Sequence, residues 1–180
     1  FESRIKIPSR ETKQEHYQVT YCGTLSKWIK IEWLEQLAID RPNWQINIIG
    51  RNYKTEISNR LKIFKNVNLY GFLKPKEVDV ILGASDACIG LYKESANIDA
   101  NSMKVYDYLA VGKPVIINEY HKYLDKDFKG LINIVSNYEE FNKVLAQPKP
   151  MPIEEVKSFL EQSSWENRVQ PIIAELINDG

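Results

Sequence analysis

The sequence predicts an α/β fold: a doubly wound, Rossmann-like parallel sheet of about six strands, followed by C-terminal helices. Short, continuous apolar runs such as residues 115–117 are typical of strands buried on both faces, as in a parallel sheet. Most of these runs end at a glycine and are followed by a segment with helical periodicity, which is the alternation of a βαβ unit. With 180 residues and 43% hydrophobic content, the chain is long enough to bury one such core.

The first half of the chain repeats one unit, a strand followed by a glycine and then a helix. The glycines are Gly23, Gly50 and Gly71. Gly23 is expected to let the backbone turn sharply where its strand ends, because glycine adopts conformations that other residues avoid. Apolar residues at helical spacing fill the intervals, and Pro42 ends the first helix. The expected segments are strands at 17–21, 44–49 and 67–70 and helices at 27–39 and 57–64.

The second half continues the alternation, with one long polar connection at residues 93–101. Its expected segments are a helix at 75–82, strands at 87–91, 114–118 and 131–135, and helices at 138–146, 153–162 and 165–178. Residues 1–15 are polar and interrupted by proline, and the sequence has no initiator Met. We therefore expect residues 1–15 to be a linker from a missing N-terminal domain, and residues 16–180 to be the domain itself.

Composition argues against several classes of function. Basic and acidic side chains balance at 24 each, but residues 1–76 hold 14 basic against 7 acidic and residues 77–180 hold 10 against 17. This split argues against a nucleic-acid footprint over the whole domain. Cys22 and Cys88 both fall in expected strands and the two histidines stand apart, so neither a disulfide framework nor a metal site is expected. No apolar run is long enough to span a membrane, and a cytoplasmic protein is expected.

The strongest candidate for a binding site is the stretch of residues 101–118. Polar residues open it, about two turns of helix follow, and Gly112 is the expected helix stop. Lys104 and Asp107 then lie within one turn of the helix N-terminus, where free N–H groups and the helix dipole attract phosphate. Lys104 adds a positive charge, and the carboxylate of Asp107 can accept hydrogen bonds from a ribose diol. The alternative is structural, since a carboxylate near a helix start often only offsets the dipole.

This stretch reads Asn-x-x-Lys-x-Tyr-Asp-Tyr-Leu-Ala-x-Gly-Lys-Pro-Val. It resembles the signature Asn-Pro-x-Lys-x-x-Glu-Tyr-x-Ala-x-Gly-Lys-Pro-Val of the donor-binding half of GT-B glycosyltransferases. It is most similar to the bacterial family-4-like enzymes that make capsule, teichuronic acid and other surface polysaccharides. In that family the Glu that matches Asp107 binds the donor ribose. Asp107 is shorter than Glu, and Ser102 replaces the usual Pro, so this chain departs from the signature at two positions.

The resemblance covers nearly the whole chain and implies roles for further residues. Asp99 stands eight residues before Asp107, which is the spacing of an acidic pair common in this family. Related enzymes often carry an Arg after the first glycine, where this chain has Thr24, so either Lys27 or Lys30 is expected to supply that charge. The resemblance also implies a diphosphate beside Gly23, the base along Gly71, Phe72 and Leu73, and the pyrophosphate and sugar at Asn101, Ser102, Met103 and Lys104.

The function expected from this resemblance is donor binding in a glycosyltransferase of hexosyltransferase type. The donor is a nucleotide-diphosphate sugar, with a UDP-sugar favoured and a GDP-sugar as the alternative, and no metal or other cofactor is expected. The acceptor is a polysaccharide or lipid-linked sugar. The catalytic base is expected in the missing N-terminal domain, so this fragment should bind without transferring. The full-length protein is expected in the cytoplasm, where peripheral contact with the inner face of the membrane is left open.

Two other functions fit the same sequence. One is a non-catalytic nucleotide-binding or interaction module of the same fold, since Asp107 and Ser102 both depart from the signature. The other is a nucleotide-sugar epimerase, although no catalytic carboxylates and histidines of that type are found. Nucleotide binding separates the first alternative from a transferase, and product analysis on the full-length chain separates the second.

Overall fold

The computed structural model describes residues 16–52, 55–93, 103–119, 128, 130–164 and 166–167. The expected linker at 1–15, the polar connection after residue 93 and most of the expected helix at 165–178 lie outside these residues. Within them, no helix is both long and apolar enough to cross a membrane.

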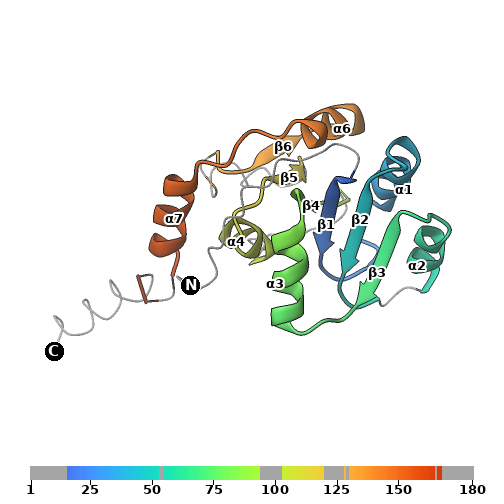
Figure 1. Ribbon diagram of the computed structural model, residues 1–180, viewed down its shortest axis with the longest axis horizontal. Helices are drawn as coiled ribbons and strands as arrows, with labels where there is room; N and C mark the ends of the chain where they lie inside the picture. Colours follow the sequence, from blue (N-terminus) through green and yellow to red (C-terminus); the bar gives the residue numbers. More distant parts are fainter. Residues whose placement is uncertain are drawn as a thin grey trace.

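The sheet has six strands in the order β3-β2-β1-β4-β5-β6, and every neighbouring pair is parallel (Figure 1). This confirms the predicted fold class. The strands are β1 (Gln18–Cys22), β2 (Gln45–Ile49), β3 (Val67–Gly71), β4 (Ala87–Gly90), β5 (Val115–Asn118) and β6 (Asn133–Val135). The strand order reverses between β1 and β4, and in open parallel sheets ligands bind beyond the carboxyl ends of the strands at such a switch point.

Helices cover both faces of the sheet. They are α1 (Ile31–Asp40), α2 (Thr55–Lys62), α3 (Pro75–Ala84), α4 (Met103–Ala110), α6 (Tyr138–Ala146) and α7 (Ile153–Gln162). Buried side chains of α1, α2 and α6 form one hydrophobic cluster with the strands, and those of α3, α4 and α7 form a second. The sheet therefore lies between two cores, as a doubly wound fold requires.

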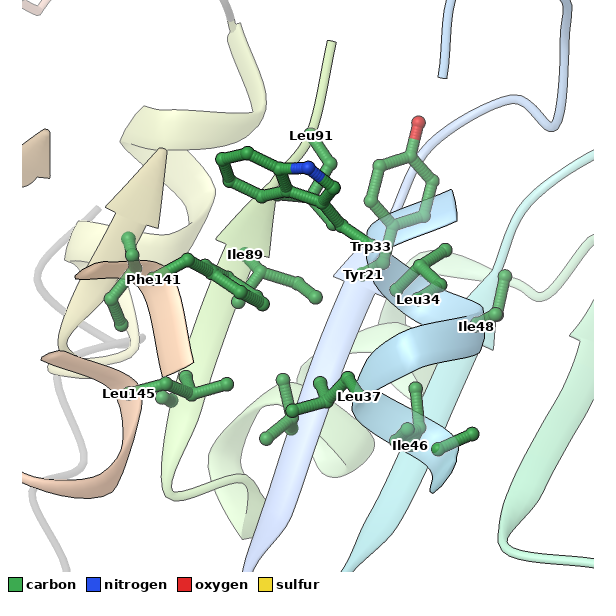
Figure 2. Packing of buried hydrophobic residues seen from close by; sticks show 14 of the residues in the cluster. Tyr21, Trp33, Leu34, Leu37, Ile46, Ile48, Ile89, Leu91, Phe141 and Leu145 are labelled. Carbon is green, nitrogen blue, oxygen red and sulfur yellow. The ribbon is translucent and has the colours of Figure 1, made fainter. Parts of the chain in front are cut away.

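The first cluster joins α1 and α6 to the strands, because both helices bury one apolar face. Leu34 and Leu37 of α1 are fully buried, as is Phe141 of α6. Burying a side chain of this size contributes roughly 1.5–3 kcal/mol. Figure 2 shows the labelled members of this cluster, which are Tyr21, Trp33, Leu34, Leu37, Ile46, Ile48, Ile89, Leu91, Phe141 and Leu145.

One predicted helix begins later than expected. The helix predicted at 27–39 starts at Ile31, and the residues before it pair with the chain that follows β4. The N–H of Lys93 donates to the carbonyl of Trp28 at 2.8 Å, and Ile29 forms an antiparallel bridge with Tyr92. These backbone groups are therefore taken up by tertiary pairing, which apolar periodicity does not reveal.

Candidate functional site

The carboxyl ends of β1, β2 and β3 meet through backbone groups alone. The N–H of Gly23 donates to the carbonyl of Ile49 at 2.7 Å, and the N–H of Gly50 donates to the carbonyl of Gly71 at 2.8 Å. Gly50 has a φ of 143°, and a Cβ there would collide with the carbonyl of Gly23. Only glycine fits this position, since other residues rarely adopt such a φ. Gly50 therefore lets the ends of β1 and β2 approach each other closely.

Gly23 differs from the sequence-based expectation. It is absent from the glycines with positive φ, which are Gly50, Gly71, Gly112 and Gly130 among the residues described. A Cβ at Gly23 would instead overlap the ammonium of Lys104 and lie 3.0 Å from the hydroxyl of Tyr21. Glycine here leaves space for the end of a lysine side chain from another element, which any larger residue would have to displace.

Helix α4 carries this lysine, and its ends are well defined by the sequence. Val105 and Leu109 face the second core, at 0% and 1% exposure. At the C-terminus the N–H of Gly112 donates to Leu109 and the N–H of Lys113 to Tyr108, which is the pattern of a Schellman motif. Gly112 has a φ of 70°, so the predicted glycine stop is confirmed.

Tyr108 anchors α4 to the strands at the switch point. Its buried hydroxyl accepts a hydrogen bond from the N–H of Cys22 at 2.8 Å and lies 3.1 Å and 3.3 Å from the carbonyls of Cys22 and Ile89. One tyrosine therefore joins α4 to the carboxyl ends of both β1 and β4. Burial raises the pKa of Tyr108 well above its ordinary value, so the hydroxyl is neutral and can donate as well as accept.

The ammonium of Lys104 lies between two aromatic rings above Gly23. It is 4.9 Å from the ring centroid of Tyr21 and 5.0 Å from that of Tyr92, which are cation–π distances. It also donates a hydrogen bond to the hydroxyl of Tyr21 at 3.5 Å. Gly23 and Lys104, each predicted to lie near the phosphates, are thus neighbours at one edge of the sheet.

This environment keeps Lys104 charged. Burial alone would lower the pKa of Lys104, but the phenolic oxygens of Tyr21 and Tyr92 raise it, and the pKa ends above its ordinary value. Burial raises the pKa of Tyr21, although the neighbouring ammonium opposes that rise. At neutral pH the edge therefore presents the Lys104 cation beside the neutral phenol of Tyr21.

Asp107 lies on the same face of α4 as Lys104, since residues three apart are neighbours on a helix. The helix begins at Met103, so Asp107 belongs to the second turn rather than within one turn of the N-terminus as expected. Its side chain is exposed. The pKa of the Cys22 thiol is raised, mainly by burial. Lys104 lowers this pKa and Asp107 raises it. The charges of Lys104 and Asp107 are thus both close enough to influence Cys22, the last residue of β1.

An aromatic residue and a cation lie together at the ends of β2 and β3. The ring of Phe72 is 68% exposed, and the guanidinium of Arg51 lies 4.9 Å from its centroid. Phe72 and Leu73 follow Gly71, as the sequence analysis placed them, but Arg51 was not among the predicted residues. The signal for Arg51 was present, because it directly follows Gly50 just as Phe72 directly follows Gly71.

Other predicted residues stand apart from this arrangement or outside the description. The ammonium groups of Lys27 and Lys30 lie over the rings of Trp28 and Trp33, each at 4.4 Å, and neither is brought to Lys104. Met103 is 68% exposed at the start of α4. Asp99, Asn101 and Ser102 lie outside the described residues. In the part of the chain that is described, no three acidic, histidine or cysteine side chains gather as a metal site.

Comparison with solved structures identifies the fold. Sucrose-phosphate synthase from Thermosynechococcus elongatus matches with a TM-score of 0.69 and 15% identity over 94% of this chain. Anabaena Alr3699/HepE, solved in complex with UDP and glucose, matches with 0.69 and 14% over 92%. WaaG, a glycosyltransferase involved in lipopolysaccharide biosynthesis, matches with 0.62 and 15% over 97%. The chain has the Rossmann-like α/β fold of one half of a GT-B glycosyltransferase.

The chain corresponds to one part of these larger proteins. It spans 47% of the sucrose-phosphate synthase chain, 49% of HepE and 53% of WaaG, which is about half of each. Comparisons of the sequence with family models and with curated proteins return no match. The GT-B assignment therefore rests on three-dimensional similarity.

Proposed function

We propose that this chain is the donor-binding half of a glycosyltransferase and that it holds a nucleotide-diphosphate sugar at the carboxyl ends of β1–β3. The observation that carries the proposal is the ammonium of Lys104 above Gly23, beside the switch point of a GT-B sheet. A cation held above the end of β1 suits a diphosphate, because an ammonium makes strong, charge-assisted hydrogen bonds to phosphate oxygens.

The two ends of the site suit the rest of a nucleotide. Asp107 is the proposed acceptor for the ribose hydroxyls, and the exposed ring of Phe72, with Arg51 beside it, is the proposed support for the base. Neighbouring strands are about 4.8 Å apart, so the end of β3, where Phe72 follows, lies about 10 Å across the sheet from the end of β1. Proposed placements at Gly71 and Leu73 for the base, and at Met103, Asn101, Ser102 and Asp99 for the sugar and pyrophosphate, follow from the resemblance described above.

UDP is the favoured nucleotide, because HepE was solved with UDP and glucose; GDP is the alternative. Within the GT-B fold we propose a family-4-like hexosyltransferase of surface polysaccharide or teichuronic acid synthesis, acting in the cytoplasm or at the inner face of the membrane. The acceptor and the catalytic base would belong to the other half of the protein. The isolated chain should then bind donor without transferring sugar, and we propose that neither a metal nor another cofactor takes part.

The experiment that tests this proposal pairs calorimetric titration with a single substitution. UDP should bind the isolated domain, and Asp107→Ala should weaken that binding roughly 10- to 150-fold, because a charged hydrogen-bond acceptor is worth about 1.5–3 kcal/mol. The free energy of unfolding, measured with urea in the absence of ligand, should change by less than about 1 kcal/mol, which is the range of a helix-dipole interaction. The exposed Glu139 offers a matched control, since Glu139→Ala removes a carboxylate from the first turn of α6, which follows β6 at the edge of the sheet opposite β3.

A second ligand sharpens the result. The wild type should bind 2′-deoxy-UDP more weakly than UDP. In Asp107→Ala the difference between the two ligands should be much smaller, because the variant has no carboxylate to accept a hydrogen bond from the 2′-hydroxyl. Lowered stability with unchanged UDP affinity would remove Asp107 from the site. If no nucleoside diphosphate binds at millimolar concentration, the non-catalytic interaction module becomes the better reading of the fold.

A further inference from the structure

Lys104 is held by contacts that reach well beyond its own helix. Its ammonium meets Tyr21 of β1 and Tyr92, which follows β4, at 4.9 Å and 5.0 Å from the ring centroids. It donates a hydrogen bond to the hydroxyl of Tyr21, and the hydroxyls of both tyrosines help to raise the pKa of Lys104. These two tyrosines come from the strands on either side of the switch point, so the ammonium lies where the two halves of the sheet diverge.

Each tyrosine is itself fixed in place. Tyr21 is 1% exposed, and its hydroxyl donates to the carbonyl of Thr24 at 3.3 Å, in the turn that follows Gly23. Its ring belongs to the first core, and its hydroxyl points away from that cluster (Figure 2). Tyr21 therefore joins the buried core to the ammonium above the strand end.

The backbone of Tyr92 is held by a side-chain amide. The N–H of Tyr92 donates to Oδ1 of Asn118 at 2.7 Å, and Nδ2 of Asn118 donates to the carbonyl of Tyr92 at 2.8 Å. Asn118 is 2% exposed and ends β5, so it extends the sheet by one pair of hydrogen bonds. The bridge between Tyr92 and Ile29 closes the other side. The backbone of Tyr92 is therefore held on both sides.

We propose that Tyr21 and Tyr92 are positioning residues that clamp the Lys104 ammonium over Gly23, so that a single preset cation faces the diphosphate. This inference rests on the proposed function. A free lysine side chain samples many rotamers, and ordering it when a ligand binds opposes binding. The clamp orders it during folding instead, and Gly23 leaves the space that the ammonium needs.

The clamp also explains why this position suits lysine. An ammonium is compact and can direct its three N–H groups toward two hydroxyls and a third, outer acceptor. The planar guanidinium of arginine is larger and presents its donors in one fixed plane. The purely structural reading is that the tyrosines use Lys104 only to hold α4 against β1; in that case their loss would affect folding and leave the cation's role in binding unchanged.

A double-mutant cycle separates the two readings. Tyr92→Phe and Tyr21→Phe keep the rings and remove the hydroxyls, and each should weaken UDP binding about 3- to 10-fold, the range of one hydrogen bond. In the Lys104→Met background the same substitutions should change UDP affinity less than about 2-fold, since no ammonium remains to be positioned. Tyr17→Phe is the matched control, because the buried hydroxyl of Tyr17 has no hydrogen-bond partner among the described residues.

A measurement without ligand keeps this test independent of the proposed function. Amines react with acetic anhydride only when neutral and accessible, so Lys104 should be acetylated more slowly than the exposed Lys27, as read by mass spectrometry. Tyr92→Phe and Tyr21→Phe should each raise the rate at Lys104 and leave the rate at Lys27 unchanged. Tyr17→Phe should alter neither rate.

The outcomes are distinguishable. Two results would overturn the clamp. One is that Tyr21→Phe and Tyr92→Phe lower UDP affinity equally in the wild-type and Lys104→Met backgrounds. The other is that neither substitution changes the acetylation rate at Lys104. If the wild type binds no nucleoside diphosphate, the proposed function fails, and the acetylation rates still decide whether the two tyrosines hold the ammonium.

Discussion

The two ends of the sheet use the same chemical device in different surroundings. At the amino end, the guanidinium of Arg41 lies 4.8 Å from the ring centroid of Trp44, and that ring lies 4.3 Å from Tyr17. At the carboxyl end, the ammonium of Lys104 lies between Tyr21 and Tyr92. Each end thus places a cation against aromatic rings, beside the starts of β1 and β2 at the amino end and beside the ends of β1 and β4 at the carboxyl end.

The two ends differ in the groups that surround each cation. At the amino end, Nε of Arg41 donates to Asn142 at 3.0 Å, and the buried Asn66 donates to the carbonyls of Ala38 and Arg41 at 3.2 Å and 3.0 Å. Protein groups pair with one another and close that end. At the carboxyl end the cation lies over Gly23, beside two more strands that end in glycine. We infer that the amino end serves stability and the carboxyl end serves binding.

The largest expected effect at the amino end comes from Trp44→Ala. Trp44 is 5% exposed, so its loss leaves a cavity under Arg41 and should lower the free energy of unfolding by about 3–5 kcal/mol. Urea unfolding measures this change. The UDP affinity of the variant, titrated where it is still folded, should equal that of the wild type. If Trp44→Ala lowers UDP affinity as well as stability, the inference that the amino end serves stability alone is wrong.

Gly50→Ala should be the most damaging small substitution at the carboxyl end. The φ of 143° and the collision with the carbonyl of Gly23 together should lower the free energy of unfolding by about 3 kcal/mol. Gly83→Ala is the matched control: its Cβ would meet nothing within 4 Å, and Gly83 lies in α3. That change should be neutral or stabilising by up to about 1 kcal/mol, because alanine favours a helix. Equal losses in the two variants would contradict the role given to the glycine edge.

Phe72→Ala should have the smallest effect on stability and a clear effect on binding. Because Phe72 is 68% exposed, the free energy of unfolding should change by less than about 0.5 kcal/mol. Stacking of a base on an aromatic ring is worth about 1–3 kcal/mol, so UDP affinity should fall roughly 5- to 150-fold. Ile63, which is 74% exposed, gives the control Ile63→Ala, for which neither quantity should change. Undiminished UDP affinity in Phe72→Ala would remove the base from this part of the edge.

Much of the fold followed from local patterns. Continuous apolar runs and their glycines predicted all six strands to within about two residues, because burial on both faces leaves a strong signal. The helix at Tyr138–Ala146 was predicted with its observed bounds, since Asn137 caps it through the N–H of Glu140. The later start of α1 could not be predicted, because it depends on pairing with the chain after β4.

The candidate site was predictable only in part. Lys104 stood out through the motif around it, and Gly23 through its place after a strand, but the contact between them depends on how α4 packs. Tyr21 was not singled out, because nothing local tells a tyrosine in a core strand from one that meets a cation 83 residues away along the chain. Tyr92 was not singled out either, since its contact with Lys104 depends on how α4 packs. Partners distant in sequence become visible only once the sheet order is known.

The most direct test of the account is an amide NMR titration of the isotopically labelled domain with UDP. The resonances of Gly23, Gly50 and Gly71 should shift with a common binding constant, because these residues lie at the carboxyl end of the sheet. Resonances of Gln18 and Gln45, at the amino ends of β1 and β2, should stay in place. Shifts centred on Gln18 and Gln45, or no shift of the three glycines at millimolar UDP, would contradict it.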